Sequence, residues 1–324
     1  MTLPVTLADI HAAAERIEPF VHQTPVFTSS TLNRELGAEL FFKAENLQKV
    51  GAFKARGATN AVLELPATST GVVTHSSGNH GQAVAYAASL RDLPAWVIMP
   101  RTAPALKMDA VRSYGAEVVL CDHAERESTA AEVMERTGAV LIHPFDNSTV
   151  IAGQGTVTLE LVGQVPDLDM VVAPIGGGGL LSGAAIVAGS QDPPIPVVGA
   201  EPFAVDDAYR SLTSGIRQPG VVSPVTVADG LLTGIGARAF TILMAHEAEV
   251  IRVSEAAILE AASFLVLRMK LLVEPSGATS LAAIRTDPER FRSRRVGVII
   301  SGGNTDLSWL GAVGSLTSLR ETSP

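Results

Sequence analysis

The sequence predicts an α/β protein with two open, mainly parallel sheets and helices on both faces of each sheet. Short, nearly continuous apolar runs alternate with alanine-rich helical stretches, which is typical of parallel strands buried on both faces. The chain has 324 residues, of which 47% are hydrophobic and 5% aromatic. This length favours two domains or one large one, and this composition favours cores of alanine, valine, leucine and isoleucine.

The expected elements follow in order along the chain. An N-terminal helix is predicted because Thr6 and Asp9 fit a capping box and Ile10, Ala13 and Ile17 recur at helical spacing. Further helices are predicted at residues 54–65, 82–90, 105–114, 179–189 and 254–272. Strands are predicted at residues 71–75, 95–99, 117–121, 140–143, 170–173, 196–200 and 296–301. The first four strands indicate one α/β unit, and the last three indicate a second.

Charge and cysteine content exclude several classes of function. The 33 acidic residues outnumber the 24 basic ones, giving a net charge of −9, so we expect no nucleic-acid or membrane partner. The single cysteine, Cys121, cannot form an intramolecular disulfide or a zinc framework, which favours a reducing, cytoplasmic location. We expect no signal peptide. Residues 170–191 carry no charge, but their six glycines and one proline predict a strand, a glycine loop and a buried helix.

Three loops that follow predicted strands contain residues suited to ligand binding, because ligands of open parallel sheets bind beyond the carboxyl ends of the strands. Residues 74–81 (THSSGNHG) offer hydroxyls, an amide and N–H groups at a helix start, which suit a carboxylate; a capped tight turn is the alternative. Residues 174–183 (PIGGGGLLSG) suit a phosphate, although helix-to-sheet packing would also explain the glycines. Their spacing fits neither G-x-G-x-x-G nor a Walker P-loop. Residues 299–304 (IISGGN) end the last strand with a hydroxyl and a flexible turn.

The chain contains only five lysines, which are Lys43, Lys49, Lys54, Lys107 and Lys270. Lys54 follows a turn of small residues and stands at the predicted start of a helix. The positive potential of a helix N-terminus lowers the pKa of a lysine and favours the free amine that a Schiff base requires. Phe53 beside it could pack against a planar ring; the alternative is an ordinary solvated lysine. The other four lysines are expected to be solvated surface charges.

Oxygen ligands after another predicted strand indicate a metal site. Glu201 and Asp207, with the carbonyl of Val205 between them, suit Mg²⁺ or Ca²⁺, which prefer oxygen ligands. Two surface carboxylates are the alternative. Glu201 also stands where an acidic residue would bind a ribose, which keeps a nucleotide-binding protein as a remote alternative.

Four ordered motifs together resemble one family. Residues 51–58 (GAFKARGA), 75–81 (HSSGNHG), 176–179 (GGGG) and 301–304 (SGGN) are similar to motifs of the pyridoxal-phosphate (PLP) enzymes of the tryptophan synthase β type. The sequence resembles the serine racemase and serine/threonine dehydratase branch in particular, from about residue 22 to residue 304. The resemblance implies fold type II, with PLP in the cleft between two domains.

The resemblance also implies a role for each matching residue. Lys54 would bind PLP covalently, and Phe53 would lie near the PLP ring. Asn79 would bind the ring hydroxyl, and Ser301 would meet the pyridine nitrogen. The phosphate would be held by the glycine loop, namely Gly176, Gly177, Gly178, Gly179 and the N–H of Leu180. The substrate carboxylate would be surrounded by Ser76, Ser77, Asn79 and His80, with Arg126 as a further candidate. Ser77 would be the acid/base of a racemase on the face opposite Lys54.

The function implied is that of a PLP-dependent ammonia-lyase. It would convert L-serine or L-threonine to a 2-oxo acid and ammonia, with serine racemase activity as a second reaction and threo-3-hydroxyaspartate as an alternative substrate. Glu201, Val205 and Asp207 fall on the racemase-like metal site. Residues 1–64 and 145–324 would form a large PLP-binding domain, and residues 65–144 a small, mobile domain that closes over the substrate. A homodimer is the expected assembly.

Overall fold

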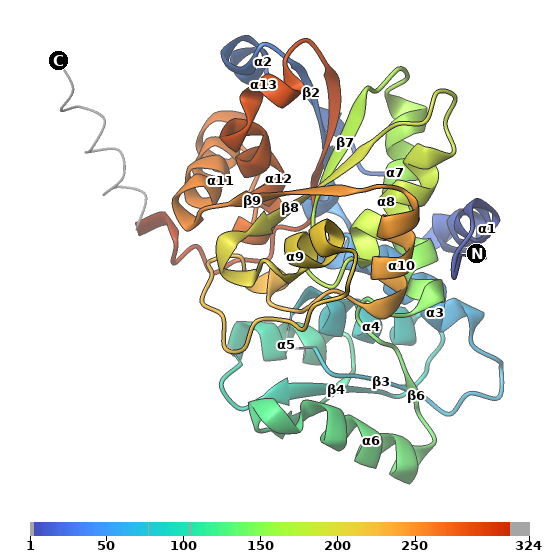
Figure 1. Ribbon diagram of the computed structural model, residues 1–324. Helices are drawn as coiled ribbons and strands as arrows, with labels where there is room; N and C mark the ends of the chain where they lie inside the picture. Colours follow the sequence, from blue (N-terminus) through green and yellow to red (C-terminus); the bar gives the residue numbers. More distant parts are fainter. Residues whose placement is uncertain (1–2, 77, 104, 312–324) are drawn as a thin grey trace.

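The computed structural model describes residues 3–76, 78–103 and 105–311, which form two sheets with helices on both sides (Figure 1). One sheet has six strands in the order β1-β2-β10-β7-β8-β9, and the other has four in the order β5-β4-β3-β6. Neighbouring strands in both sheets are parallel, except that β1 runs antiparallel to β2. The predicted fold class is confirmed.

Each strand and helix predicted from the sequence is present in the structure. The strands are β1 (Val26–Phe27), β2 (Glu39–Ala44), β3 (Val72–Thr74), β4 (Ala95–Pro100), β5 (Glu117–Cys121), β6 (Val140–Leu141), β7 (Met170–Pro174), β8 (Val197–Pro202), β9 (Glu249–Val253) and β10 (Arg295–Ile300). The helices are α1 (Leu7–Ile17), α2 (Ser30–Leu36), α3 (Lys54–Glu64), α4 (Asn79–Ser89), α5 (Ala105–Ser113), α6 (Arg126–Thr137), α7 (Ser148–Gln164), α8 (Gly179–Gly189), α9 (Asp207–Ser214), α10 (Ala237–Ala245), α11 (Glu255–Met269), α12 (Pro275–Thr286) and α13 (Pro288–Phe291).

Two details of these elements affect the site. The capping box of Thr6 and Asp9 is present and starts α1 as predicted. Helix α4 begins at Asn79, three residues before the predicted start at residue 82. Its first residues, Asn79, His80 and Gly81, are poor helix formers, which hid the true start. Because the helix starts earlier, Asn79 and His80, two of the residues expected to bind a carboxylate, lie on its first turn.

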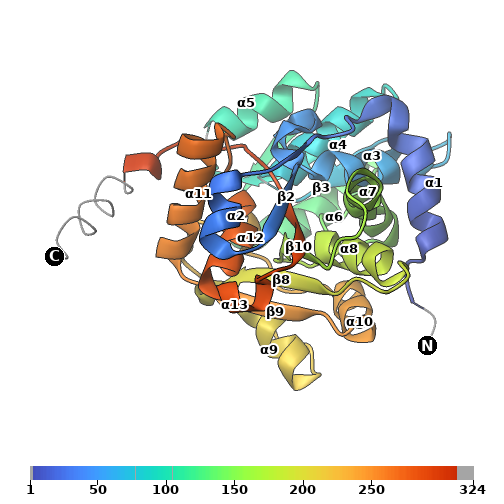
Figure 2. The same cartoon turned by 90° about the horizontal axis from the view of Figure 1, so that it is seen from above.

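Helices cover both faces of each sheet. The six-stranded sheet packs against α11 and α12 on one face and against α7, α8 and α10 on the other (Figure 2). The four-stranded sheet packs against α3, α4 and α5 on one face and against α6 on the other (Figure 1). The cores consist of alanine and aliphatic side chains, as the composition predicts.

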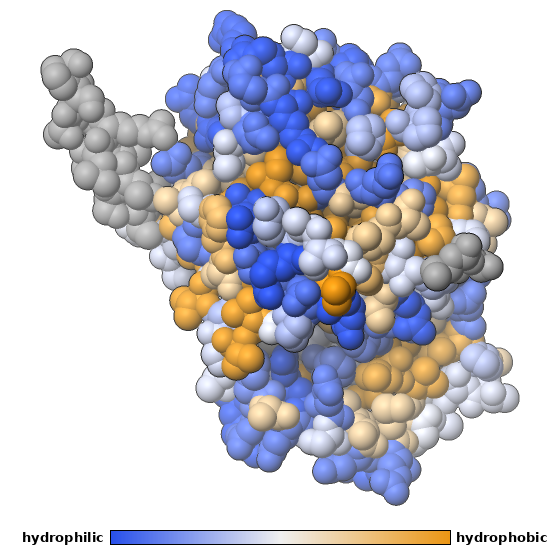
Figure 3. Space-filling model, in the orientation of Figure 1, coloured by the Kyte–Doolittle hydropathy of each residue, from blue (hydrophilic) through white to orange (hydrophobic). Residues whose placement is uncertain are grey.

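The surface is polar at both ends of the molecule. Figure 3 shows hydrophilic residues around α2 at the top and around α6 at the bottom, with hydrophobic residues gathered in the band between them. Within the described residues, no helix has the length and apolar character needed to cross a membrane.

Candidate active site

Lys54 is the first residue of α3, and the turn before it is joined to the loop after β10. The Phe53 N–H donates to the Ser301 carbonyl at 3.0 Å. Gly51 has a φ of +69°, and a Cβ at this position would lie 2.6 Å from Oδ1 of Asn304. Glycine is needed here both for the backbone angle and for the close approach of the two loops. Two of the predicted ligand-binding segments therefore lie side by side.

The Lys54 amine is poised as a nucleophile. Its Nζ donates a hydrogen bond to the Pro144 carbonyl at 2.7 Å and lies 5.1 Å from the centre of the Phe53 ring. Burial lowers the pKa of Lys54 from its ordinary value of 10.5 to about 8, against the opposing effect of the Glu274 carboxylate. The sequence reasoning attributes a lowered pKa to the helix N-terminus; the main cause in the structure is desolvation.

The glycine loop connects β7 to α8. Gly178 caps the helix with a φ of +86°, and a Cβ on Gly177 would collide with the ring of Phe145. Both positions therefore require glycine. The first N–H groups of α8 have no acceptor within the helix. The helix dipole also gives this end of the helix a partial positive charge. This arrangement suits a phosphate group.

Asn79 is held between two residues that lie far away in the sequence. Its Nδ2 donates to the Glu274 carboxylate at 2.9 Å, and its Oδ1 accepts from Nδ2 of Asn304 at 2.9 Å. Glu274 is 5% exposed, and burial, reinforced by Asp229, raises its pKa to about 8. The sequence reasoning gave Glu274 no role, because nothing local marks it as buried.

The loop predicted to bind a carboxylate lies at the start of α4. The Ser76 hydroxyl accepts a hydrogen bond from the Gly78 N–H at 3.4 Å. The His80 ring is 1% exposed, with Nε2 3.0 Å from the Ile142 carbonyl, and burial holds its pKa well below 6.5. The backbone N–H of His80 has no acceptor within α4 and is thus available to an anion. Ser77 lies outside the described residues.

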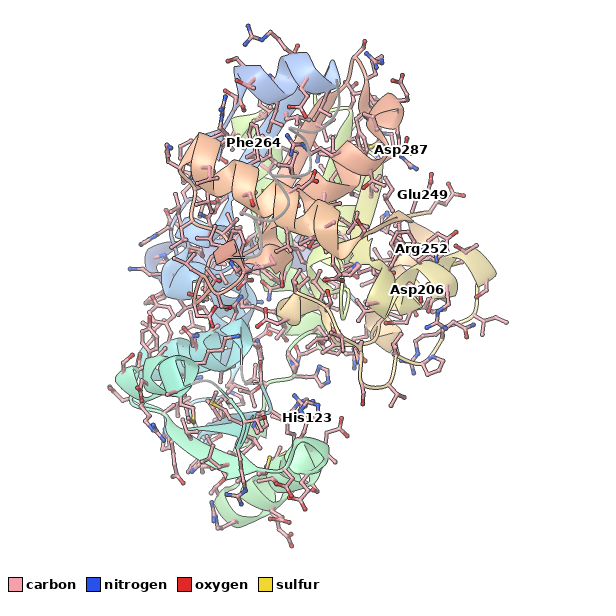
Figure 4. All side chains as sticks on the ribbon, turned by 90° about the vertical axis from the view of Figure 1, so that its left-hand side faces the viewer. His123, Asp206, Glu249, Arg252, Phe264 and Asp287 are labelled. Carbon is pink, nitrogen blue, oxygen red and sulfur yellow. The ribbon has the colours of Figure 1, made fainter. Side chains whose placement is uncertain are left out.

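Arg126 lies at the start of α6, and its guanidinium contacts the carbonyl and ring of His123 at 3.2 and 3.3 Å. His123 lies on the side of the four-stranded part that faces the six-stranded part (Figure 4). Within the described residues, Arg126 forms no ion pair with a carboxylate. Nearby is a cavity of about 280 Å³ lined by His75, Glu127, Ala130, Ala131, Met134, Leu141 and His143.

The predicted metal ligands lie at the end of β8. Both carboxylate oxygens of Glu201 accept N–H groups from the first turn of α9, at 2.8 and 2.9 Å, and Asp207 accepts the Ile235 N–H at 2.7 Å. Burial raises the pKa of Glu201 to about 8 and also raises that of Asp207. Neither carboxylate has a cationic partner among the described residues. The described residues contain no cluster of three or more His, Cys, Asp or Glu side chains for a metal, so this site would depend on the Val205 carbonyl.

Asp206 lies between the predicted ligands Val205 and Asp207 in the sequence, but its carboxylate is paired with two arginines. Its carboxylate binds Arg210 and Arg252, each at 2.9 Å. Figure 4 shows Asp206 next to Arg252. Although burial acts to raise it, the two guanidinium groups lower the pKa of Asp206. Asp206 is therefore paired with cations, whereas Glu201 and Asp207 accept only backbone N–H groups in the bonds given above.

A buried ionic network anchors the start of α3. Lys43 is fully buried and binds Glu160 at 2.6 Å, so the expectation that it is a solvated surface charge was wrong. Arg56, two residues after Lys54, is also fully buried and binds Glu45 at 2.8 Å and Glu160 at 2.6 Å. The network fixes α3 to β2 and α7, and so fixes the position from which Lys54 extends.

Comparison with known proteins agrees with this geometry. A family model described as pyridoxal-phosphate dependent enzyme matches residues 17–302. The chain is 50% identical to serine racemase of Dictyostelium discoideum, over 94% of this chain and 96% of the relative. It is 47% identical to β-hydroxyaspartate dehydratase of Paracoccus denitrificans (strain Pd 1222), over 94% of this chain and 98% of the relative.

Solved structures give the same result. The crystal structure of the Dictyostelium discoideum serine racemase has a TM-score of 0.89 and covers 94% of this chain and 100% of that chain. The crystal structure of a threonine deaminase from T.th. is 45% identical, with a TM-score of 0.90, and covers 94% of this chain and 99% of that chain. On this evidence, the chain belongs to the family of pyridoxal-phosphate dependent enzymes.

Proposed function

We propose that this chain is an ammonia-lyase that converts L-serine and L-threonine to the 2-oxo acid and ammonia. The observation that carries the proposal is that Lys54, with its lowered pKa, and Asn79, on the first turn of α4, both lie near the Glu274 carboxylate. The relatives named serine racemase and threonine deaminase support this choice of substrates. The remote alternative, a nucleotide-binding protein, has no support because Glu201 is 1% exposed and already accepts two N–H groups.

The residues present fit PLP. The glycine loop would hold the phosphate, since the first N–H groups of α8 have no acceptor within the helix and lie at its positive end. Asn79 would hold the ring hydroxyl and Phe53 would lie near the ring. The Ser301 hydroxyl, which has no hydrogen-bond partner among the described residues, would meet the pyridine nitrogen. When bound, PLP supplies an electron sink that stabilises negative charge at the substrate Cα.

The protein residues supply orientation and proton transfer. The N–H groups at the start of α4 and the Ser76 hydroxyl would bind the substrate carboxylate, with the helix dipole adding to the attraction. The Lys54 amine would take the proton from Cα, which requires an unprotonated amine near neutral pH. A hydroxyl at Ser301 does not enforce a charged pyridine nitrogen, which favours rapid loss of the β-hydroxyl.

The direct test is to incubate the purified protein separately with L-serine, L-threonine and threo-3-hydroxyaspartate. The 2-oxo acid and ammonia released are measured for each. We expect release from L-serine and L-threonine. A PLP-loaded protein that releases no 2-oxo acid from either would contradict the proposal.

We further propose serine racemase activity, with Ser77 as the second acid/base. Serine racemases among the relatives support it. Ser77→Ala should stop the formation of D-serine but spare elimination from L-serine, and chiral chromatography separates the two. Equal loss of both reactions in this variant would contradict a two-base mechanism.

The second candidate substrate is threo-3-hydroxyaspartate. The relative named β-hydroxyaspartate dehydratase supports it, and so does Arg126, which forms no ion pair with a described carboxylate. Arg126 would donate hydrogen bonds to one of the two carboxylates of this substrate. If it binds the second one, Arg126→Met will lower kcat/KM for 3-hydroxyaspartate far more than for L-serine.

We propose that Glu201, Asp207 and the Val205 carbonyl bind Mg²⁺ or Ca²⁺. Two buried carboxylates without a cationic partner among the described residues support the site, as does its all-oxygen donor set. Their raised pKa values mean that a cation competes with protons. The rise in Tm caused by Mg²⁺ should therefore grow between about pH 5 and pH 8, and it should vanish in Asp207→Asn.

We also propose the domain division given by the sequence, with residues 65–144 closing over the substrate. All four strands of the smaller sheet lie within this range.

A homodimer is supported by the exposed side chains of Leu267 and Leu272 near the end of α11, which are 55% and 51% exposed. A cytoplasmic location is supported by the free, buried Cys121. Light scattering of the purified protein tests the dimer.

A further inference from the structure

The four-residue turn from His143 to Asp146, between β6 and α7, contacts both Lys54 and the glycine loop. No sequence motif had singled it out. The Pro144 carbonyl accepts the hydrogen bond from Lys54 Nζ at 2.7 Å. On either side of this carbonyl, the turn is held by its own side chains and by the glycine loop.

The His143 ring holds the turn by accepting two backbone hydrogen bonds within it. Its Nδ1 accepts the Asp146 N–H at 2.9 Å and the Phe145 N–H at 3.4 Å. An Nδ1 that accepts cannot carry a proton, so the ring must be neutral. Burial, followed by the neighbouring His75, lowers the pKa of His143 to about 4, in agreement with this geometry. The Phe145 N–H belongs to the same peptide group as the Pro144 carbonyl, and the Asp146 N–H belongs to the next one, so the ring constrains the direction of that carbonyl.

The far side of the turn is joined to the glycine loop. The ring of Phe145 packs where a Cβ on Gly177 would be. The Asp146 carboxylate accepts the N–H of Arg238 at 2.9 Å, at the start of α10. The residue before α10, Gly236, donates its N–H to the Gly177 carbonyl at 3.1 Å. The turn thus keeps a fixed distance between the Lys54 amine and the predicted phosphate site.

We propose that His143 is a positioning residue for the Lys54 amine. Its ring holds the Pro144 carbonyl where that carbonyl retains the amine beside the glycine loop whenever Lys54 is not bonded to the cofactor. This inference rests on the proposed role of Lys54. A lysine side chain has four rotatable bonds, and a fixed acceptor removes the need to search for the reactive position.

The test compares His143→Gln with His143→Asn in the full chain stripped of PLP. The asparagine oxygen takes the place of Nδ1 and keeps the acceptor, whereas the glutamine amide takes the place of Nε2 and loses it. PLP is added, and the rate at which it bonds to Lys54 is followed by its visible absorbance. Borohydride reduction and peptide mass analysis confirm the lysine. His246→Gln, on a histidine remote from the cleft, is the matched control.

We expect the glutamine variant to capture PLP about tenfold more slowly, the effect of one lost positioning hydrogen bond. The asparagine variant and the control should stay close to the wild-type rate. If His143→Gln captured PLP at the wild-type rate, or if His143→Asn were slowed as much as His143→Gln, the inference would be overturned. If the wild-type chain captures no PLP at Lys54, the proposed function falls together with it, so the two failures are distinguishable.

Discussion

The two sides of the site are built differently. The cofactor side, residues 51–54, 176–180 and 301–304, is held by buried hydrogen bonds and close glycine contacts with the six-stranded sheet. The substrate side, residues 75–76 and 78–80 together with Arg126, belongs to the four-stranded part, where Arg126 is half-buried and bonds only to its neighbour His123 among the described residues. The difference teaches that the proposed amine and phosphate site are held by contacts between distant segments, whereas Arg126 is held only within its own turn.

The cofactor side gains its rigidity from charges placed where water is absent. Arg56 and Lys43 share Glu160, and both side chains are fully buried. Burying such charges is costly unless every one is paired, so the network allows few alternative arrangements. The substrate side is joined to the six-stranded part by the hydrogen bonds of Asn79 and by the ion pair of Lys107 and Asp229, whose side chains are 24% and 50% exposed. An exposed ion pair of this kind contributes little to the free energy of folding.

The largest effect should come from the cofactor side itself. Lys54→Ala removes both the covalent partner of PLP and the proposed base, so activity on every substrate should fall by about 10³-fold or more. The visible absorbance of the lysine-bonded cofactor should also disappear. Lys49→Ala, in the turn before α3, is the control and should keep the absorbance. A Lys54→Ala protein with an unchanged visible spectrum would remove Lys54 from the site.

The second largest effect should be on stability. Arg56→Met leaves Glu45 buried without its partner, and the free energy of unfolding should fall by about 3–5 kcal/mol. Urea denaturation measures the change. Arg112→Met breaks an exposed pair with Asp109 and is the control, with an expected change of about 1 kcal/mol or less. Similar values for the two variants would mean that the buried network does not stabilise the cofactor side.

The third effect is a pH dependence of stability at Glu274, where the two sides meet through Asn79. Because its pKa is raised to about 8 in the folded protein, Glu274 favours folding when protonated. Its contribution is complete below about pH 4.5 and is lost as the pH rises towards 8. PLP-free wild type should therefore lose stability relative to Glu274→Gln over this range, by up to about 1.4 kcal/mol per pH unit. Glu132→Gln, on an exposed face of α6, should show no such trend.

The sequence predicted those parts of the site that depend on local backbone. The glycine loop and the start of α3 are visible as turn and helix signals, and both lie where predicted. Strand β2 was missed because it contains Lys43, whose partner Glu160 is 117 residues away. No local pattern reveals that a charge will be buried and paired.

Glu274 and the turn at His143 were missed for the same reason. The surroundings of Glu274 come from Asn79, 195 residues away, and from the loop after β10. The role of the turn at His143 depends on the hydrogen bond from Lys54 to Pro144, and these two residues are 90 positions apart in the sequence. The pattern of Ser76 and Asn79 predicted an anion site but not that the His80 ring would be buried against the Ile142 carbonyl.

The smallest effect is expected at the contact between the two sides. Lys107→Met removes the ion pair with Asp229, and the free energy of unfolding should change by about 1 kcal/mol or less. The pair nevertheless joins α5 to the six-stranded part, so its loss should raise KM for L-serine about two- to threefold with kcat unchanged. A double-mutant cycle with Asp229→Asn isolates the contribution of the pair. A loss of stability as large as that of Arg56→Met would show that the substrate side is held as rigidly as the cofactor side, and the comparison would fail.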